Sequence, residues 1–477
     1  MMKRLFIFII IIFIIVSYNV TLAISYIPVN SYIYPLLEYL EAKGCINSGI
    51  LTTYPLSNEE VERLIHQAKN NCADKEDPYL QESMKLINRF LFSYQNEEIL
   101  PYWKPVKNFW ITYAYSNSVL SRTYTFNNQG DEYGKGSNVR LGITTEIGYK
   151  NVSLVLSPEL RQGREFEGVY LKEGYLVYNW KNLNFLIGKQ SMWWGPGRGG
   201  SIILSDNAPG FTMIRVENNY PYVLRWLGLF KFSFFVTRLG ENRVVPHPYL
   251  WGLRLNIKPC PFFELGLSRT ALLGGKGRST TLSTWIKSFL AKDENTPKEP
   301  GDQRAGFDVK VNVPNKYLPF QTYLEAEGED EAGNLPEKWA YIWGFYVPQL
   351  YKLPFLSLRV EFAGTDRAWY IHHIYKSGYT YDGKIIGYYI GRDARSFLLS
   401  LGYWWLKQKI RLNVIGIRVK HHINDQEDRI YKIKFQKFWF LNCTIYGEID
   451  YFKITKYLGT SQNKNFWIGI IGLKVSF

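Results

Sequence analysis

From about Phe109 to the last residue, Phe477, apolar and polar side chains alternate in one stretch after another. The alternation is clearest in residues 139–150, 251–258, 356–363 and 467–477. A period of two residues is the pattern of a β-strand with one apolar and one polar face. A soluble β-sandwich could produce the same pattern. The number of these stretches, their large aromatic side chains and the absence of helical segments between them favour a transmembrane β-barrel.

The aromatic content agrees with a barrel. The chain has 477 residues with 36 Tyr, 29 Phe and 15 Trp, a load that excludes a disordered protein and exceeds that of ordinary soluble enzymes. Past the N-terminus no apolar run reaches the roughly 18 residues of a membrane-spanning helix, which excludes a polytopic helical protein. At roughly 9–11 residues per strand plus turns, residues 109–477 accommodate about 16 to 20 strands. The final strand, which ends in Phe477, resembles the terminal strand of bacterial outer-membrane proteins.

The N-terminus has the pattern of a secretory signal peptide. Lys3 and Arg4 precede an apolar run from Leu5 to Val16, and the small residue Ala23 follows. We expect cleavage after Ala23 and export to the bacterial outer membrane. An uncleaved N-terminal helix is the alternative.

Residues 31–100 have a helical period instead. Ser57 and Glu60 form a capping box, Pro78 occupies a first helical position, and apolar residues recur every three or four positions. We therefore expect a signal peptide over 1–23, a periplasmic helical bundle over 24–108 and an outer-membrane barrel over 109–477. Cys45 and Cys72 both fall in the bundle, where they could form a disulfide or remain two buried thiols.

The charge is divided unevenly between the two regions. The whole chain carries 57 Lys and Arg against 42 Asp and Glu, a net charge of +15. Residues 24–108 hold 8 basic and 11 acidic residues, a net of −3, and the signal peptide holds +2, so the barrel carries +16. A basic barrel suits acidic polysaccharide, and it suits anionic outer-membrane lipid equally well.

The least generic stretch is 188–211, GKQSMWWGPGRGGSIILSDNAPGF. Its glycines do not make a phosphate-binding loop, because no Lys-Ser/Thr follows them and no βαβ unit surrounds them. Adjacent tryptophans beside an arginine instead suit carbohydrate, since Arg pairs with carboxylates. The alternative is a folded-in loop with both tryptophans in its core. The candidate polysaccharide-binding residues are Trp193, Trp194, Arg198, Asp206, Asn207 and Arg215.

This stretch resembles the signature of the capsule assembly Wzi family of outer-membrane proteins. The segment 51–57, LTTYPLS, which leads into a helix, is also similar to the start of that family. The resemblance implies a mainly β fold, with a transmembrane barrel of about eighteen antiparallel strands and a small N-terminal α-helical bundle in the periplasm. It also implies a lectin-like role in attaching capsular polysaccharide to the cell surface.

The expected partners are acidic capsular polysaccharide, outer-membrane lipid and export machinery, with no nucleic acid, and we expect a monomer. One rival is a porin or polysaccharide-export channel, which would conduct ions. A second is a glycan hydrolase using carboxylates of 325–331, although residues 328–337 have the composition of a solvated loop. The pairs His372–His373 and His421–His422 could bind a metal ion, but neighbouring strand residues point to opposite faces, so we interpret them as loop or rim residues. We therefore predict no catalytic residues, no metal and no cofactor.

Overall fold

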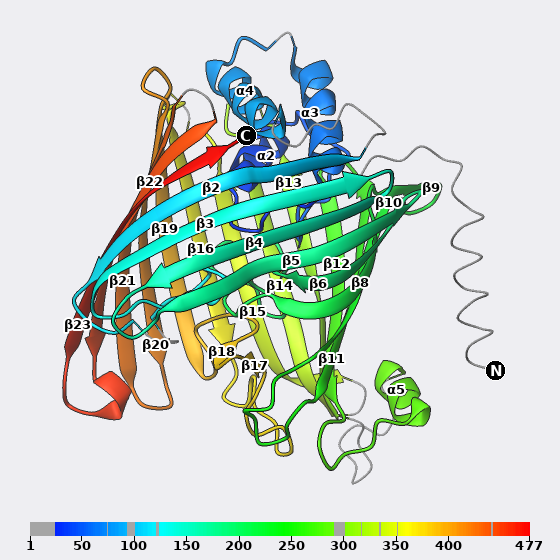
Figure 1. The fold of residues 1–477 in the computed structure, drawn as a ribbon, viewed down its shortest axis with the longest axis vertical. Coiled ribbons are helices and arrows are strands. Elements are labelled where there is room, and N and C mark those ends of the chain that lie inside the picture. Colours follow the sequence, from blue (N-terminus) through cyan, green and yellow to red (C-terminus); the bar gives the residue numbers. More distant parts are fainter. Residues whose placement is uncertain are drawn as a thin grey trace.

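The computed structural model describes residues 24–73, 75–92, 101–120, 124–290, 301–315, 317–332, 335–350, 352–439 and 442–477. The predicted signal peptide, 1–23, lies outside these residues. Figure 1 shows a tall closed barrel with a cluster of helices over one end, which we call the bundle end; the opposite end is the far end. The C-terminus lies at the bundle end.

Eighteen antiparallel wall strands close the barrel within the described residues, which confirms the predicted fold class. The short strand β9 continues the wall position of β8, since both pair with β10. Closure is made by β2, which pairs with β3 on one side and with the last strand, β23, on the other. The wall strands are β2 Tyr102–Ser116, β3 Gly136–Tyr149, β4 Val152–Gln162, β5 Gly168–Trp180, β6 Leu183–Gln190, β8 Phe211–Asn218, β9 Tyr222–Leu224, β10 Gly228–Arg238, β11 Tyr249–Cys260, β12 Phe263–Leu273, β13 Gly301–Val313, β14 Phe320–Ala332, β15 Leu335–Val347, β16 Leu356–Thr365, β19 Ala394–Trp405, β20 Ile410–His421, β21 Gln426–Phe438, β22 Cys443–Thr455 and β23 Lys464–Ser476.

The alternation seen in the sequence sorts side chains between lipid and lumen. In β3, Leu141 and Ile147 are exposed on the outer surface, whereas Arg140 and Glu146 are buried inside. Lipid cannot hydrogen-bond to a charged group, so the charged face must turn inward, where partners are available. Closure of the ladder also leaves no strand edge unpaired in the membrane.

Three helices form the bundle: α2 Ile33–Ala42, α3 Asn58–Cys72 and α4 Pro78–Phe92. The expected capping box is present, because the Ser57 hydroxyl accepts a hydrogen bond from the Glu60 amide at 3.1 Å. None of the helices in the described part of the chain is long and apolar enough to cross a membrane. The first wall strand begins at Tyr102, a few residues before the predicted domain boundary, and the placement of the bundle in the periplasm stays a prediction.

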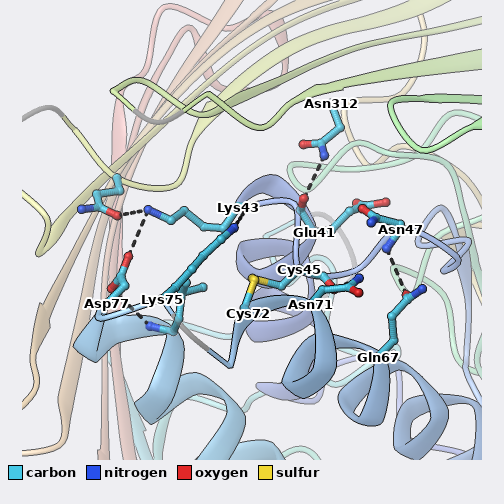
Figure 2. The surroundings of a disulfide bond; sticks show 12 residues. Glu41, Lys43, Cys45, Asn47, Gln67, Asn71, Cys72, Lys75, Asp77 and Asn312 are labelled. Carbon is cyan, nitrogen blue, oxygen red and sulfur yellow. Dashed lines mark hydrogen bonds and ion pairs between the residues drawn. A yellow bond between two sulfur atoms is a disulfide. The ribbon is translucent and has the colours of Figure 1, made fainter.

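A disulfide joins Cys45 to Cys72, and so links the turn after α2 to the end of α3 (Figure 2). Polar contacts continue around it: Lys43 pairs with Asp77 at 3.0 Å, and Asn312 of β13 donates to the Glu41 carbonyl at 2.8 Å. The disulfide therefore holds α2 and α3 together at the place where α2 meets the barrel wall.

Three long connections turn into the lumen rather than outward. We call them insertion A (117–135, between β2 and β3), insertion B (191–210, between β6 and β8) and insertion C (366–393, between β16 and β19). Insertion B contains β7 Trp193–Trp194, which pairs with β1 Thr53–Tyr54 of the N-terminal region. Insertion C contains the hairpin of β17 Thr380–Tyr381 and β18 Lys384–Ile385. The remaining elements are α5 Leu282–Phe289, after β12, and the single-turn η1 Tyr457–Gly459, before β23.

We expected residues 328–337 to form a loop, and this is wrong for most of them. Strand β14 continues to Ala332 and β15 begins at Leu335. Glu325, Glu327 and Glu329 lie on the inner face of β14 and are buried. Arg304 forms an ion pair with Glu329, and this inner-face partner explains why an acidic run forms a strand. The sequence does not display a partner that lies on a neighbouring strand.

Candidate functional site

Insertion B leaves the barrel wall after Gln190 and returns at Phe211, and these two residues are cross-strand partners. The excursion therefore begins and ends at one point of the wall. Inside the lumen it pairs with the N-terminal region, Thr53 with Trp194 and Tyr54 with Trp193. The Gly195 amide extends this pairing by donating to the Thr52 carbonyl at 2.8 Å. The stretch with the most unusual sequence is thus a plug segment tied to the bundle.

Trp193 and Trp194 are both buried, with 5% and 1% of their surface exposed. Trp194 packs edge-on against Phe235 of β10, with ring centroids 5.4 Å apart. The Trp193 indole N–H donates to the Gly195 carbonyl at 3.2 Å. Neither indole face is open to a sugar in this arrangement. It matches the alternative given above, a folded-in loop with both tryptophans in its core.

Arg198 connects insertion B to the bundle. Its guanidinium donates to the Tyr54 hydroxyl at 2.7 Å and to the Glu38 carboxylate at 3.3 Å. Burial opposes the charge of Arg198, but the Glu38 carboxylate outweighs this effect and raises the pKa of Arg198 above its ordinary value. The Glu361 carboxylate of β16 accepts the amide N–H groups of Arg198 and Gly199, both at 2.7 Å. Both the side chain and the backbone at this position are therefore already bonded within the protein.

Asp206 and Asn207 pack against the other two insertions. The side-chain amide of Asn207 donates to the Ile385 carbonyl of insertion C at 2.8 Å. The backbone carbonyl of Asp206 accepts from the backbone N–H of Gln129, in insertion A, at 2.7 Å. Burial raises the pKa of Asp206 to about 6. These two residues therefore lie where the three insertions meet.

Arg215 faces the lumen from β8, with 1% of its surface exposed. Its guanidinium lies over the Tyr26 ring at 4.6 Å and forms an ion pair with Glu217 at 3.3 Å. The six residues predicted from the sequence thus divide into separate contact sets: the β1–β7 pairing, the contact with the bundle, the meeting point of the insertions, and the wall at β8. Direct glycan contact by any of them stays a prediction.

A cavity of about 370 Å³ lies elsewhere in the lumen, and we call it the lumen chamber. Inward residues of β2–β5 and β21–β23 form its walls, residues 25–32 bound it from the N-terminal region, and residues 127–133 of insertion A close it on another side. None of the six predicted residues lines it. A volume in this range is typical of pockets for small molecules.

The lumen chamber is polar and aromatic. Its charged lining consists of Lys107, Asp131, Arg140, Glu159, Lys172, Glu173, Lys434, Glu448 and Lys474. Most of these charges are compensated within the protein; Lys172 pairs with Asp131 at 2.9 Å, and Lys434 pairs with Glu448 at 3.0 Å. Lys474 also faces the chamber; among the described residues it has no ion pair or hydrogen bond at contact distance, and the carboxylate that acts on its charge is that of Glu173.

Lys474 has an aromatic neighbour. It is the cross-strand partner of Trp110 in the β2–β23 ladder, so the two side chains emerge side by side into the chamber. The Trp110 indole N–H donates to Glu159 at 2.8 Å. On the next strand a Cβ at Gly142 would collide with the Trp110 ring, so the indole lies against this glycine. Glycine at position 142 therefore lets the indole lie along the wall.

Sequence reasoning missed Trp110 and Lys474. They are about 360 positions apart in the chain, and only barrel closure makes them neighbours. A signal was present, because the alternation places Lys474 on the polar face of the last strand, while Trp110 occupies a polar-face position of β2 between Asn108 and Thr112. An aromatic residue on the polar face of a barrel strand indicates a lumen contact.

Two of the three buried carboxylates of β14 bind the insertions, whereas Glu327 Oε2 has no hydrogen-bond partner among the described residues. Glu325 accepts from the Ser201 hydroxyl at 2.9 Å and from the Ile202 amide, which fixes insertion B to the wall. Glu329 accepts from the Tyr370 amide of insertion C at 2.9 Å. Within the described ranges no group of three or more His, Cys, Asp or Glu could hold a metal ion.

The fold and its occupied lumen define an outer-membrane β-barrel protein, and the protein lies in the outer membrane. Residues 112–439 match the model of one family, described as capsule assembly protein Wzi. The chain belongs to this family.

Two further comparisons agree with this membership. A Klebsiella pneumoniae protein described as an uncharacterized 55.8 kDa protein in the cps region is 30% identical over 321 residues, which cover 65% of this chain. The match spans 59% of that relative's length, less than two thirds of it. The structure of Escherichia coli Wzi, described as an outer-membrane protein involved in group 1 capsule assembly and a carbohydrate-binding β-barrel, has a TM-score of 0.76 at 20% identity. It covers 95% of this chain and 99% of that chain.

The likeness to Wzi at this identity concerns the fold alone. The barrel wall is shared more widely, since Acinetobacter baumannii OccAB2 gives a TM-score of 0.50 at 9% identity and covers 78% of this chain and 97% of that chain. Barrels with very different sequences therefore share this wall. Function has to be argued from what fills the lumen.

Proposed function

We propose that this protein binds an acidic capsular polysaccharide at the outer membrane, as a lectin-like protein without catalytic activity, and that a sugar unit of the polysaccharide enters the lumen chamber. The observation that carries the proposal is Lys474, which lies beside the indole of Trp110 in a polar cavity and, among the described residues, forms no ion pair or hydrogen bond at contact distance. Its nearest charge partner is Glu173, which acts on it through the cavity. A uronic-acid carboxylate would form a direct ion pair with Lys474, while the indole offers an apolar face to a sugar ring. Membership of a capsule assembly family supports a glycan ligand.

The charge and hydrogen-bonding groups of the lumen chamber suit a polyhydroxylated acid. The five cationic side chains of the lining exceed its four carboxylates by one. Glu173 Oε1, which has no hydrogen-bond partner, can accept from a hydroxyl. Asn127 and Asn128 each present a side-chain oxygen that is also without a partner. Buried polar atoms without partners cost free energy, and hydroxyl groups of a ligand can supply the partners.

The contents of the lumen favour a binding protein over a conducting channel. The N-terminal region and the three insertions meet inside the barrel, through contacts such as the β1–β7 pairing and the hydrogen bond between Ser205 and Ile386 at 3.0 Å. The role without catalysis has similar support, because Glu325 and Glu329 act as anchors for insertions B and C.

We further propose that the bundle end faces the periplasm and the far end faces the cell exterior. The far end carries the longer excursions, including α5 and η1, whereas short turns such as 150–151 and 261–262 join strands at the bundle end (Figure 1). Short periplasmic turns and long external loops are typical of outer-membrane barrels. Labelling in intact cells of a cysteine placed at the exposed Glu76 would contradict this orientation.

The test is binding of polysaccharide purified from the surface of producing cells to the detergent-solubilised protein. Lys474→Ser should weaken binding about tenfold, the effect of losing one charge-assisted contact. Lys453→Ser, which removes an exposed outward lysine from β22, is the matched control and should leave binding unchanged. Binding by the wild type should weaken as salt is added, because salt screens exposed charges.

Neutral dextran gives the second comparison. Its binding by the wild type should be weak and insensitive to Lys474→Ser. Equal binding of the acidic polysaccharide by the wild type and Lys474→Ser would show that the lumen chamber is not the binding site. Absence of binding by the wild type and every variant would contradict the lectin-like function. Release of capsule into the medium from cells lacking the protein, with export continuing, is the cellular counterpart; loss of export would favour a channel.

A further inference from the structure

Helix α5 is separate from the other helices. It follows β12 at the far end of the barrel and lies beside the outer wall (Figure 1). Trp285 packs edge-on against Tyr249 with ring centroids 5.5 Å apart, and Phe289 lies 5.3 Å from the Trp251 ring. Tyr249 and Trp251 occupy lipid-facing positions of β11, which alternate with the inward Leu250. The helix is therefore docked on the lipid side of the wall.

The docking covers a defined patch. Trp251, Ala271 and Leu273 lie on the outer face of β11 and β12, yet each is at most 2% exposed. The Trp251 indole N–H donates to the Ser288 hydroxyl at 2.9 Å. A tryptophan in contact with lipid would have no partner for this N–H, so the helix both covers the ring and satisfies its donor.

An arginine fixes the C-terminal end of α5. Arg269 projects from the lipid face of β12, and its guanidinium donates to the Ser288 carbonyl at 3.1 Å. It also donates to the side chain of Gln303. The last carbonyls of a helix lack partners within the helix and attract a cation. Because a charge on the lipid face is costly, these bonds indicate a built contact between helix and wall.

The outward side of α5 is apolar. Leu282, Ile286 and Phe289 are 76%, 49% and 51% exposed, and Leu290, at 54%, continues the row. Their spacing of three and four positions places them in one stripe along the helix. This stripe lies beside the lipid-facing residues of β10 to β12, which form the apolar belt of the barrel on this side.

The same segment is basic. The connection between β12 and β13, residues 274–300, holds five basic and three acidic residues, a net charge of +2, and its basic residues before and within α5 are Lys276, Arg278 and Lys287. A helix with an apolar stripe and basic neighbours is typical of segments that lie in a membrane interface, where lysines meet anionic headgroups.

We propose that α5 is an interfacial helix that binds anionic lipid of the adjoining leaflet: its stripe of Leu282, Ile286, Phe289 and Leu290 contacts the acyl chains, and the exposed Lys276, which precedes the helix, contacts a phosphate group. The occupant is lipid because the stripe continues the lipid-facing belt of the wall. These contacts would fix the depth of the far end in the membrane on the side of β11 and β12.

The first test measures the depth of a nitroxide spin label on Ile286→Cys, in protein carrying Cys260→Ser and Cys443→Ser. The protein is reconstituted in vesicles of phosphatidylcholine mixed with phosphatidylglycerol. Collisions with oxygen, which concentrates in lipid, should exceed collisions with a water-soluble nickel complex at position 286. The matched label on Thr284→Cys, which lies about 160° around α5 from Ile286, should show several-fold lower lipid access. Heat-modifiable migration in gels checks that each labelled protein is folded.

Two results would overturn the proposal. Greater access of nickel than of oxygen at position 286 would place the stripe in water. Dipolar broadening between labels would show that the stripe packs against a second copy of the chain.

The second test addresses headgroups. Spin-labelled phosphatidylglycerol should be immobilised by the wild type more than spin-labelled phosphatidylcholine. Lys276→Ser should reduce this preference by about fivefold. An unchanged preference would overturn the phosphate contact.

Discussion

The two sides of the lumen differ in how completely they are filled. On the side of β10–β16 and β19, insertions B and C are bonded to the wall through Glu325, Glu329 and Glu361. On the side of β2–β5 and β21–β23 the wall faces the lumen chamber, where Lys474 forms no ion pair or hydrogen bond at contact distance with the described residues. The unusual motif lies on the filled side, and the cavity in which we propose that a ligand binds lies on the other. A distinctive sequence can therefore be a structural requirement, whereas a binding site can come from residues that are each unremarkable in the sequence.

The largest effect is expected on the filled side, from Glu361→Ala. This change removes the acceptor for the buried amides of Arg198 and Gly199, at about 2 kcal/mol for each bond to a charged group, or about 4 kcal/mol together. Urea unfolding in detergent should show the loss, and current recordings in planar bilayers should show openings that the wild type lacks. Glu361→Gln, which keeps one acceptor, should lose about half as much. An unchanged unfolding midpoint for Glu361→Ala would mean that insertion B does not depend on this anchor.

The bundle should respond to loss of its disulfide. Replacing both Cys45 and Cys72 with Ser opens a loop with a sequence separation of 27, for which loop-closure entropy gives about 3 kcal/mol. Protease should then cleave within 24–92 sooner, while the barrel stays heat-modifiable. Cys260→Ser with Cys443→Ser, which changes the two free cysteines, is the control. Equal cleavage of the reduced and oxidised wild type would contradict the prediction.

Acid should weaken the contact between the bundle and the wall. Burial alone would raise the pKa of Glu41, but Lys258 and Lys310, at 2.9 and 2.8 Å, hold it at about 2. A carboxyl whose pKa is lower in the folded state stabilises that state above its unfolded pKa, so this contribution of about 3 kcal/mol is present at neutral pH and is lost as pH falls from about 4.5 to 2. Proteolytic susceptibility of the bundle measured against pH should show a step in this window.

Glu41→Gln tests the assignment of that step. The variant should be less stable than the wild type at pH 7 and should lack the Glu41 component of the acid step. A wild-type profile that keeps its full step in the variant would assign the acid response to other carboxylates.

The smallest effect is expected on the chamber side, from Gly142→Val. The new side chain would displace the Trp110 indole without changing any charge. Affinity for the acidic polysaccharide should fall about tenfold, or about 1.4 kcal/mol.

Arg198→Ala should cost stability, since it breaks the contacts with Glu38 and Tyr54, but should change affinity by less than about twofold in folded protein. The reverse order of the two affinities would return the binding site to insertion B.

Much of the fold could be predicted because it depends on local pattern. The alternation assigned the wall strands, and Ser57 and Pro78 marked the starts of α3 and α4. Lumen geometry depends instead on which strands close the barrel. The proximity of Trp110 and Lys474, or of Arg198 and Glu38, exists only after residues far apart in the chain have been brought together. The loop expected at 328–337 was wrong for the same reason, because Arg304, the partner of Glu329, lies on another strand.

The pairing of β1 with β7 has a consequence for the order of assembly. Thr53 and Tyr54 are synthesised well before their partners Trp194 and Trp193, and Thr53 also bonds to Arg254 of β11. The last ladder to form in chain order is the one between β23 and β2. The N-terminal region therefore forms its final contacts only after β7 and β11 have been synthesised. The β2–β23 ladder, which closes the barrel, then forms around the N-terminal region and the insertions. Pairing of β2 with β23 then closes the lumen. A factor that delays this pairing during membrane insertion would also determine whether the N-terminal region and the insertions are inside the lumen when the barrel closes.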